Sequence, residues 1–567
     1  MKNPGPNMQD LSLVHGVPLS EETGIGALTL GGYLRDVTEH FGPREAAVLR
    51  EGSKVERWTY HELWARSTGV ARALIACGIG KGARVGILMT NRLEFLSSFF
   101  GAALAGGVAT PMSTFSTAAE LDVLLKNSAC SVLLIEGNVL SKDFAEMLKQ
   151  LEPRIADASP GSLYSLRFPF LRHLAMVDAE QSRGAIESWP AFLDRGATVA
   201  AEYIDATADS VTPADPGVLF FSSGSTGKPK GILSAHRGAC LQLWRWPQWY
   251  EFGDDVRCWS ANGFFWSGNF AMAIGGALAS GGSLVLQRTF LSEEALELMD
   301  AERVTYPFAW PHQWAQLTGA KNWLDVDLSS LKYVDANCPI TGHPTVRTTW
   351  LEPSSAYGNT EAFTLISVFP ANTPSEVHGG SHGLPVPGSS IKIVEPFEGH
   401  TLVRGESGEI AQKGANLMLG YVGIPLQETL DEEGFFHTGD GGFIDEQGRL
   451  HWQGRLNNII KTGGANVSPL EVDAVIATCP GVKITQTIGV ADELLGELVV
   501  SCIVAREGAE LTANGVREFA RQTLASYKAP RQVLFFDESE IELTGSAKVK
   551  TEKLRELAAK RLLENKD

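Results

Sequence analysis

The sequence predicts an α/β protein of at least two domains, and three observations lead to this prediction. The chain has 567 residues, which is too long for one ordinary hydrophobic core. Its first part alternates apolar runs with amphipathic stretches of helical length. From Gly405 the pattern changes to short strands with glycine turns, and after Arg455 a new mixed pattern begins. We therefore expect an N-terminal domain at 1–454, a hinge at 455–458 and a C-terminal domain at 459–567.

The N-terminal part reads as strands that alternate with helices. Residues 85–89 form an apolar run that predicts a buried strand, and residues 93–105, mostly small and apolar, predict a helix. Residues 131–135 predict the next strand. Strands separated by helices form parallel sheets covered on both faces. We expect such a sheet here, with residues 153–188 as a less regular excursion on the surface.

The sequence pattern changes in the last third of the chain. Residues 405–410 and 445–450 predict tight turns between short strands, which indicates a small β-rich subdomain. Beyond Arg455 the pattern predicts a compact α+β domain that ends in a charged helix. Its expected elements are a helix from about 469, strands at 485–490 and 499–504, and helices at 515–525 and 551–565.

Composition and charge exclude several classes of protein. Hydrophobic residues make up 44% of the chain and charged residues 20%, as in a packed globular protein. The net charge of −18 argues against sequence-independent nucleic-acid binding, which needs a basic surface. The polar N-terminus predicts no signal peptide, and no apolar run reaches the roughly 18 residues of a membrane span. Scattered cysteines without a CxxC pair indicate reduced thiols, so we expect a cytoplasmic protein. The sequence leaves the oligomeric state open, a homo-oligomer included.

The strongest local signal is the glycine-rich segment at residues 219–231, LFFSSGSTGKPKG. An apolar strand leads into a loop whose glycines let backbone N–H groups approach an anion, while hydroxyls add donors and lysines add positive charge. An exposed Gly/Ser loop without function is the alternative, but this density of donors favours a polyphosphate site. The residues expected to bind the nucleotide are Ser222, Ser223, Gly224, Ser225, Thr226, Gly227, Lys228 and Lys230.

This loop is not of the Walker type. The pattern G-x-x-x-x-G-K-[ST] requires glycine at position 222 and serine or threonine at position 229. The chain has Ser222 and Pro229 instead. Proline has neither a hydroxyl for Mg²⁺ nor a backbone donor, so the segment predicts a phosphate loop of another kind.

The loop is similar to the signature loop of the adenylate-forming superfamily, which includes acyl-CoA synthetases, peptide-synthetase adenylation domains and beetle luciferases. Other landmarks of that family follow in the right order between about Trp58 and Lys548. The resemblance implies an α/β fold with a large N-terminal domain of two αβα-layered subdomains plus a small β-barrel-like subdomain. A small, mobile α+β C-terminal domain follows. It also implies ATP, Mg²⁺ and CoA as cofactors and a carboxylic acid, a small molecule, as substrate.

A second family motif, Y-G-x-T-E, matches residues 357–361, YGNTE. A carboxylate at its end suits a hard cation that bridges phosphate oxygens. By resemblance, the expected roles are adenine contact for Tyr357, α-phosphate binding for Thr360 and Mg²⁺ binding for Glu361. Gly358 is also expected to belong to the nucleotide site. The family's adenine-side Gly-Gly-Ala-Pro segment is Ala336–Pro339 here, and it contributes Asn337 and Cys338.

Three further positions resemble family landmarks. Asp440, in a Thr-Gly-Asp motif, and Arg455 match the residues that contact the ribose. Lys548 matches the catalytic lysine, whose ammonium would neutralise the charge that builds up during adenylation. A solvated lysine in a charged tail is the alternative, because Lys548 follows Ala547 instead of the usual glycine. The resemblance makes Lys548, Thr360 and Glu361 the catalytic residues.

Residues 461–471 are similar to the loop that meets the pantetheine arm of CoA after the C-terminal domain rotates. Lys461, Gly463 and Gly464 form the expected CoA loop, since glycine lets a thiol arm pass close to the backbone. The family hinge, usually Asp or Lys, is Asn457 here. Asparagine tolerates a left-handed backbone better than most residues, so a hinge is expected at this position.

Two features of the sequence bear on the class of acid: a group of aromatic residues and Gly358. In the family, the helix after the phosphate loop and the segment at 264–266 line the acyl pocket, which makes Trp244, Phe265 and Trp266 candidate pocket residues. Ordinary core packing is the alternative for these aromatics. Acetate-specific relatives close the pocket with tryptophan at the second position of Y-G-x-T-E. The chain has Gly358 there, so we expect an open pocket for an aryl or a medium-to-long-chain apolar acid.

The sequence thus favours an ATP-dependent carboxylate–CoA ligase, and three alternatives stay open. The chain could stop at adenylation or load a carrier protein. It could be a luciferase-like oxygenase, which shares these motifs. It could also be a non-catalytic nucleotide-binding regulator, although nothing in a regulator would require Lys548, Glu361 and Asp440 together.

Overall fold

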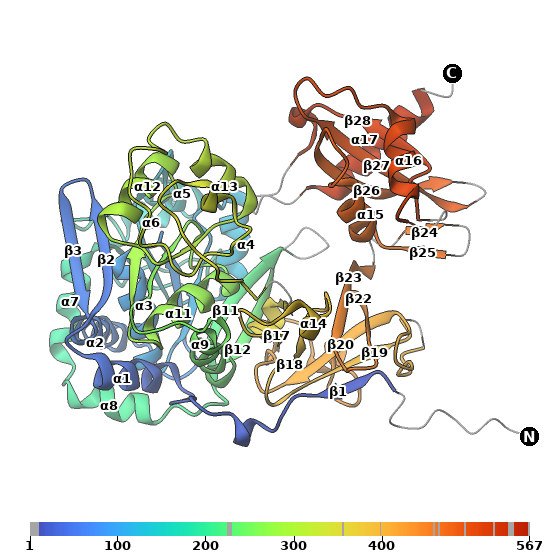
Figure 1. Ribbon diagram of the computed structural model, residues 1–567. Coiled ribbons are helices and arrows are strands. Elements are labelled where there is room, and N and C mark those ends of the chain that lie inside the picture. The colour runs from blue at the N-terminus through green and yellow to red at the C-terminus, as the bar shows by residue number, and fades with distance from the viewer. Residues whose placement is uncertain are drawn as a thin grey trace, which may run out of the picture. The chain divides into compact units, whose positions relative to one another are not determined.

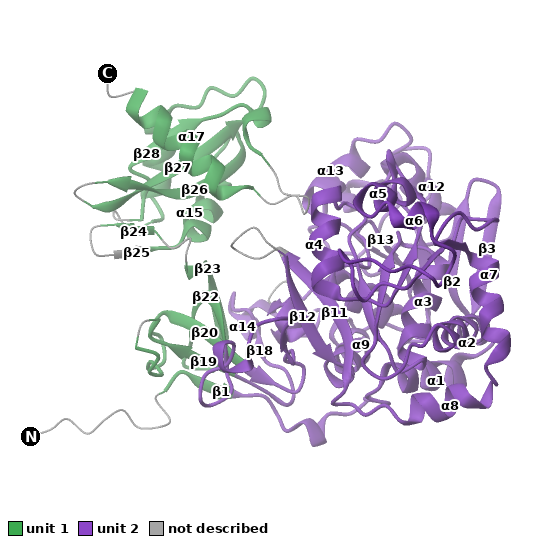
Figure 2. Ribbon diagram, turned by 180° about the vertical axis from the view of Figure 1, so that it is seen from behind, with its two compact units in different colours: residues 1–14, 391–412, 437–567 green, residues 15–390, 413–436 purple. Residues whose placement is uncertain are grey.

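The computed structural model describes residues 11–223, 229–353, 356–396, 398–456, 460–462, 465–492, 495–524, 528–542 and 549–564. Its contacts divide the chain into two compact units, coloured differently in Figure 2. Unit 2 consists of residues 15–390 and 413–436. Unit 1 consists of residues 1–14, 391–412 and 437–567.

Unit 2 has the predicted α/β architecture (Figure 1). Its larger sheet has eight strands, parallel from β10 to β11 and antiparallel at β12 and β21. In order across the sheet they are β10 (Ile186–Ser188), β9 (His173–Met176), β6 (Val132–Ile135), β4 (Arg84–Leu88), β5 (Val108–Pro111), β11 (Pro216–Ser223), β12 (Pro229–Ala235) and β21 (Gly420–Tyr421). The predicted strands at 85–89 and 131–135 are β4 and β6, and the helix between them is α3 (Leu93–Leu104), so these predictions are confirmed.

A second sheet of unit 2 has five strands, of which only β3 is antiparallel to its neighbour. Across the sheet they are β15 (Tyr306–Phe308), β13 (Arg257–Ser260), β14 (Ser283–Leu286), β2 (Glu45–Glu51) and β3 (Lys54–Thr59). One hydrophobic core joins side chains of both sheets with helices α1 (Leu30–Phe41), α2 (Tyr60–Ala76), α3 and α9 (His236–Tyr250). Because α3 contacts strands of both sheets, these helices form a shared layer between them.

The outer face of each sheet has its own helices and its own smaller core. Helices α4 (Ala118–Ser128), α5 (Phe144–Leu151) and α6 (Arg154–Asp157) cover the eight-stranded sheet, and α12 (Ser292–Ala301) and α13 (Pro311–Thr318) cover the five-stranded one.

Local sequence fixes where two of the helices of unit 2, α4 and α2, begin. Thr117 caps α4 and Glu120 returns the bond, and Thr59 with Glu62 does the same for α2, which satisfies backbone donors that the first turn leaves open.

The prediction for residues 153–188 is wrong in part. This segment contributes two strands, β9 and β10, that extend the eight-stranded sheet at its edge. Both are short, and polar residues such as His173 and Glu187 interrupt their apolar pattern. Pairing, rather than local sequence preference, makes them strands: β9 pairs with β6, and β10 pairs with β9.

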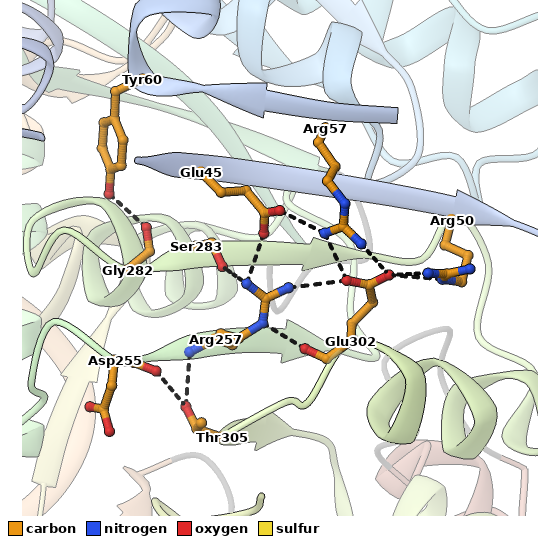
Figure 3. A network of polar contacts seen from close by, with 10 residues as sticks. All are labelled: Glu45, Arg50, Arg57, Tyr60, Asp255, Arg257, Gly282, Ser283, Glu302 and Thr305. Atoms are coloured by element: carbon orange, nitrogen blue, oxygen red, sulfur yellow. Dashed lines mark hydrogen bonds and ion pairs between the residues drawn. The ribbon is translucent and has the colours of Figure 1, made fainter. Parts of the chain in front are cut away.

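A cluster of charged residues ties the five-stranded sheet together (Figure 3). The side chain of Glu302, only 2% exposed, forms ion pairs with Arg50 of β2, Arg57 of β3 and Arg257 of β13. Glu45 of β2 pairs with Arg57 and Arg257 as well. The network joins three strands to the connection between α12 and β15, and thereby fixes the strand that leads to residues 264–266.

Unit 1 contains the predicted β-rich subdomain and a separate α+β sheet. The first is a five-stranded sheet of β1 (Leu13–His15), β19 (Ser389–Val394), β20 (Gly408–Gly414), β22 (Phe436–Ile444) and β23 (Leu450–Arg455). The second contains β25 (Ala465–Val467), β24 (Ile460–Thr462), β27 (Gly496–Ala505), β26 (Val482–Asp492) and β28 (Gln532–Phe535). Its helices are α15 (Pro469–Ile476), α16 (Ala513–Arg521) and α17 (Thr551–Glu564), so the predicted elements of the last domain are confirmed, with α16 starting and ending earlier than expected.

The compact units do not follow the domain boundary that the sequence predicts. The contact division groups the β-rich sheet with the C-terminal elements, whereas the sequence places it in the domain that ends at 454. The hinge at Asn457 lies outside the described residues, so the boundary at 455–458 stays a prediction. None of the helices among the described residues is long and apolar enough to cross a membrane.

Candidate active site

The glycine-rich segment connects two paired strands of the larger sheet. β11 and β12 run antiparallel, with Ser222 opposite Lys230 and Ser223 opposite Pro229. Lys230 therefore lies at the base of the loop, beside Ser222. The loop residues Gly224, Ser225, Thr226, Gly227 and Lys228 lie outside the described residues, as does the side chain of Ser223.

Glu361, Tyr421 and Lys230 come together next to the base of this loop. The hydroxyl of Tyr421 donates a hydrogen bond of 2.6 Å to Oε1 of Glu361, and the Nζ atom of Lys230 lies 5.1 Å from the centre of the Tyr421 ring. Tyr421 belongs to β21, which pairs with β12. The backbone N–H of Met418 also donates to the carbonyl of Glu361 at 2.7 Å. The predicted cation ligand Glu361 and the predicted phosphate-binding residue Lys230 thus both contact Tyr421, the first through its hydroxyl and the second through its ring.

The turn that carries Thr360 and Glu361 is held from three sides. Asn359 caps the short helix η6 (Thr360–Ala362) by accepting a hydrogen bond from the backbone of Ala362. The buried amides of Gln242 in α9 and Asn416 each donate to the carbonyls of Ala362 and Leu365. Buried carbonyls need such partners, so these two amides fix the position of the turn.

Gly358 is required by the backbone around it. It lies in β16 (Ala356–Asn359), which pairs with β17 (Thr364–Val368) through an irregular register between Tyr357 and Gly358. A Cβ at position 358 would lie 1.7 Å from the carbonyl oxygen of Thr364. This contact is a reason for glycine that is independent of the acyl pocket. Tyr357, its neighbour, is buried.

The carboxylate of Asp335 organises the backbone around residues 336–339, the predicted adenine-side segment. Asp335 accepts hydrogen bonds from the backbone N–H groups of Asn337 and Glu352, through its two oxygens. Asn337 is exposed and Cys338 half-buried. Burial raises the pKa of the Cys338 thiol to about 11, so this group is protonated at neutral pH.

In unit 1, Asp440 and Arg455 are direct partners. They lie opposite each other on β22 and β23, with 3.0 Å between Nε of Arg455 and Oδ1 of Asp440. Arg455 also donates to the carbonyl of Thr438 at 2.8 Å, while the Asp440 side chain is nearly buried. The structure thus brings together the two predicted ribose residues.

The remaining predicted residues of unit 1 belong to the C-terminal sheet or its connections. Lys461 is exposed on β24, and its backbone N–H donates to Glu497. Asn457, Gly463, Gly464 and Lys548 lie outside the described residues. Their roles stay predictions.

The three aromatic residues predicted for the acyl pocket have different surroundings. Phe265 and Trp266 contact each other, with ring centres 4.7 Å apart. Trp244 instead packs edge-on against Tyr33 of α1, and its indole N–H donates to the carbonyl of Ala27. The Trp244 indole is occupied in packing α9 against α1, so the structure gives its pocket role no support.

Sequence reasoning missed three residues that shape this site: Gln242, Asn416 and Tyr421. Each acts on a partner far along the chain; Tyr421 and Glu361 are 60 positions apart. No local motif marks them. Only the pairing of β21 with β12 brings Tyr421 to Glu361, and this is a tertiary feature.

Two family models match most of the chain. Residues 34–422 match the AMP-binding enzyme model, and residues 471–548 match the AMP-binding enzyme C-terminal domain. The chain belongs to the AMP-binding enzyme family. The predicted superfamily and its α/β fold are therefore confirmed, and the chain is an AMP-forming acid–thiol ligase.

Relatives within the AMP-binding enzymes are distant but similar over nearly their full length. A Mycobacterium tuberculosis enzyme named 3-[(3aS,4S,7aS)-7a-methyl-1,5-dioxo-octahydro-1H-inden-4-yl]propanoyl:CoA ligase is 30% identical, over 91% of this chain and 96% of its own. 4-Coumarate–CoA ligase 3 of Oryza sativa is 30% identical, over 86% of this chain and 85% of its own. The crystal structure of ATP-bound MatB from Rhodopseudomonas palustris has the same fold, with a TM-score of 0.73 and 24% identity over 93% of this chain and 99% of MatB.

Proposed function

We propose that this AMP-binding enzyme converts an apolar carboxylic acid, ATP and CoA into acyl-CoA, AMP and pyrophosphate, with an acyl-adenylate as intermediate. The observation that supports the proposal best is the cluster of Glu361, Tyr421 and Lys230 at the base of the glycine-rich loop. In this cluster Glu361 would supply a carboxylate for a cation, and Lys230 would supply an ammonium group for a phosphate. A nucleoside triphosphate with a bound metal ion needs both groups, a negative one for the metal and a positive one for the phosphates.

In the first step a carboxylate oxygen of the acid attacks the α-phosphorus of ATP. The bond from that phosphorus to the bridging oxygen breaks, and pyrophosphate leaves with the electron pair. Thr360 would donate to the α-phosphate, and Lys548 would neutralise charge on the pentacoordinate phosphorus. Lys230 and the loop hydroxyls would hold the departing phosphates. Positioned charges of this kind supply most of the catalysis in phosphoryl chemistry.

The residues present fit a magnesium ion. Mg²⁺ in nucleotide sites commonly uses one or two protein carboxylates and completes its shell with phosphate oxygens and water. Glu361 would be the carboxylate, and Tyr421 orients it through Oε1. Bound there, Mg²⁺ would screen the negative charge of the phosphates.

Asp440 and Arg455 of unit 1 would hold the ribose. The Asp440 carboxylate can accept hydrogen bonds from ribose hydroxyls, and its ion pair with Arg455 fixes its orientation beforehand. In the second step the thiol of CoA loses its proton, its sulfur attacks the acyl carbon, and AMP leaves with the carboxylate oxygen. Lys461, Gly463 and Gly464 would border the path of the thiol arm.

The proposed acid is aryl or medium-to-long-chain and apolar. The names of two relatives support an acid of this size, since one relative acts on 4-coumarate and the other on a propanoyl chain attached to a fused bicyclic ring. The aromatic pair Phe265 and Trp266 would line its apolar part.

A panel of acids tests the proposed function directly. The protein is incubated with ATP, Mg²⁺, CoA and one acid at a time, and AMP and acyl-CoA are measured by liquid chromatography. We expect both products in equal amounts with at least one aryl or apolar acid. Without CoA we expect no acyl-CoA and no more AMP than one turnover of acyl-adenylate can release. Acyl-AMP without CoA-dependent release would replace the ligase by an adenylation-only or carrier-loading enzyme. Oxygen-dependent light emission would indicate a luciferase-like enzyme, and no turnover with any acid would indicate a regulator.

A further inference from the structure

We propose that Phe115 and Trp310 join Trp266 in an aromatic strip that selects acids with a planar ring over saturated acids of the same size. The inference rests on the proposed function, because it names the class of acid for that site. Phe115 and Trp310 have no role in the nucleotide site described above. They come from segments nearly 200 positions apart in the sequence.

The strip lies where α/β proteins place their ligands. Phe115 follows β5, Trp266 follows β13 and Trp310 follows β15, so all three come after the carboxyl ends of parallel strands. β5 is the parallel neighbour of β11, which leads into the glycine-rich loop. Ligands of open parallel sheets bind in the crevice outside these carboxyl ends. The strip therefore borders the same strand ends as the predicted phosphate loop and joins the two sheets of unit 2.

The rings of the strip form one continuous series of contacts. Phe115 stacks on Trp266 with 5.8 Å between ring centres and 30° between planes, and Trp266 contacts Trp310 at 4.9 Å and 39°. Phe265 closes one side, 5.7 Å from Phe115. Phe115 is 51% exposed and the two indoles are half-buried. The exposed half of Phe115 therefore leaves ring surface against which another ring can be placed.

Hydrogen bonds hold both sides of the strip in position. The buried side chain of Asn91 donates to the carbonyl of Asn262 at 2.7 Å and accepts from the backbone N–H of Phe264 at 2.9 Å, which fixes the segment before Trp266. On the other side, Nζ of Lys142 donates to the carbonyls of Thr114 and Ser116, the two neighbours of Phe115. A preformed surface binds a rigid ring with little loss of side-chain freedom.

The chemistry of the strip favours a flat ring over an alkyl chain. Aromatic rings attract one another through their quadrupoles in offset and tilted arrangements, in addition to burying apolar area. A saturated chain gains only the free energy of burying apolar area. The neighbouring His312, 6.0 Å from Trp310, does not add a charge at neutral pH, since burial lowers its pKa from the ordinary value.

The test compares cinnamate with nonanoate, acids of equal carbon number, in the complete protein. Phe115→Leu and Trp310→Leu keep an apolar side chain but remove the ring, and Phe170→Leu removes an exposed ring outside the strip. We expect each strip variant to lower kcat/KM for cinnamate about 5-fold to 10-fold, with nonanoate and the KM for ATP nearly unchanged. Phe170→Leu should change none of these values. Equal thermal unfolding midpoints would exclude a folding defect, and Phe115 is exposed enough for its replacement to be harmless.

Binding measurements separate this inference from the proposed function. Titration calorimetry of cinnamate into the protein without ATP should give weaker binding for both strip variants than for wild type or Phe170→Leu. Undetectable binding to wild type, equal binding by all four proteins, or equal losses for cinnamate and nonanoate in turnover would each overturn the strip. Failure of the whole acid panel would remove the proposed function alone, because calorimetry still decides whether the strip binds a ring.

Discussion

A single hydrogen bond can prepare a cation site before the cation arrives. The hydroxyl of Tyr421 fixes one oxygen of Glu361, while its ring faces the ammonium of Lys230. A carboxylate held in this way does not have to be ordered when metal and nucleotide bind, so less of the binding energy is lost. In the proposed mechanism, Tyr421 is thus a positioning residue that would act through Glu361.

Tyr421→Phe tests this role because it removes only the hydroxyl. We expect the Mg²⁺ concentration for half-maximal activity to rise by about 10-fold, the lower range for removing an orienting partner of a metal ligand. The KM for the acid should stay unchanged. Steady-state rates over a Mg²⁺ titration measure both, and Tyr203→Phe, an exposed tyrosine far from Glu361 in sequence, serves as control. An unchanged Mg²⁺ dependence would show that the hydroxyl has no such role.

The turn at Glu361 depends on two amides that serve the same carbonyls. Asn416→Leu leaves the carbonyls of Ala362 and Leu365 with Gln242 as their remaining partner, and Gln242→Leu does the reverse. Each change should lower the free energy of unfolding by about 1–3 kcal/mol. Because both amides share their acceptors, the double variant should show a coupling energy of at least about 0.5 kcal/mol. Urea unfolding of the four proteins measures it, and additive losses would contradict a shared function.

At the scale of elements, ion pairs connect the β2–β3 hairpin with β13, although β14 lies between them in the sheet. Three arginines converge on the buried carboxylate of Glu302 (Figure 3). Burial by itself would raise the pKa of Glu302, but hydrogen bonds from Arg57 and Arg50 outweigh it and lower the pKa below its ordinary value. Ionised Glu302 therefore stabilises the folded protein.

Glu302→Gln should lower the free energy of unfolding by about 2–3 kcal/mol at neutral pH, because the arginines that lose their partner are partly exposed. The sign of the pH dependence follows from the lowered pKa. The difference from wild type is fully present above the unfolded-state pKa and is lost as the pH falls through the lower folded-state pKa. Thermal unfolding between neutral and acidic pH measures this, with Glu297→Gln on the exposed face of α12 as control. A difference that is constant with pH would rule out the carboxylate as its origin.

Elements with a strong local pattern could be predicted from the sequence, and those made by pairing could not. β6 is uniformly apolar, and β4 and α3 consist mostly of apolar and small residues, so their burial could be predicted from their own residues. β9 and β10 are short and contain polar residues, and they are strands because β9 pairs with β6 and β10 pairs with β9. The same distinction holds at the site. Glu361 and Asp440 lie in motifs, whereas Tyr421 and Gln242 act over 60 and 120 positions and leave no local sign.

At the scale of the whole molecule, the two half-reactions should depend on different residues. Following the family pattern, Lys548→Ala should lower the adenylation rate about 10²-fold to 10³-fold, the scale of losing one charge donor at a transition state. Thioester formation from supplied acyl-AMP should change much less. Gly464→Leu should do the opposite and let acyl-AMP accumulate, because a side chain would narrow the path of the thiol arm. Separate assays of the two steps measure this; equal losses in both steps for either variant would indicate a structural role.

The central claim is that this chain joins an acid to a thiol through an acyl-adenylate, and the fate of the carboxylate oxygen tests it most directly. An acid labelled with oxygen-18 in its carboxylate is converted with ATP and CoA, and the products are analysed by mass spectrometry. Attack of the carboxylate on the α-phosphorus leaves one labelled oxygen in AMP when the thiol displaces it. The account predicts this label in AMP and none in pyrophosphate. Label in inorganic phosphate, or acyl-CoA formed with unlabelled AMP, would contradict it.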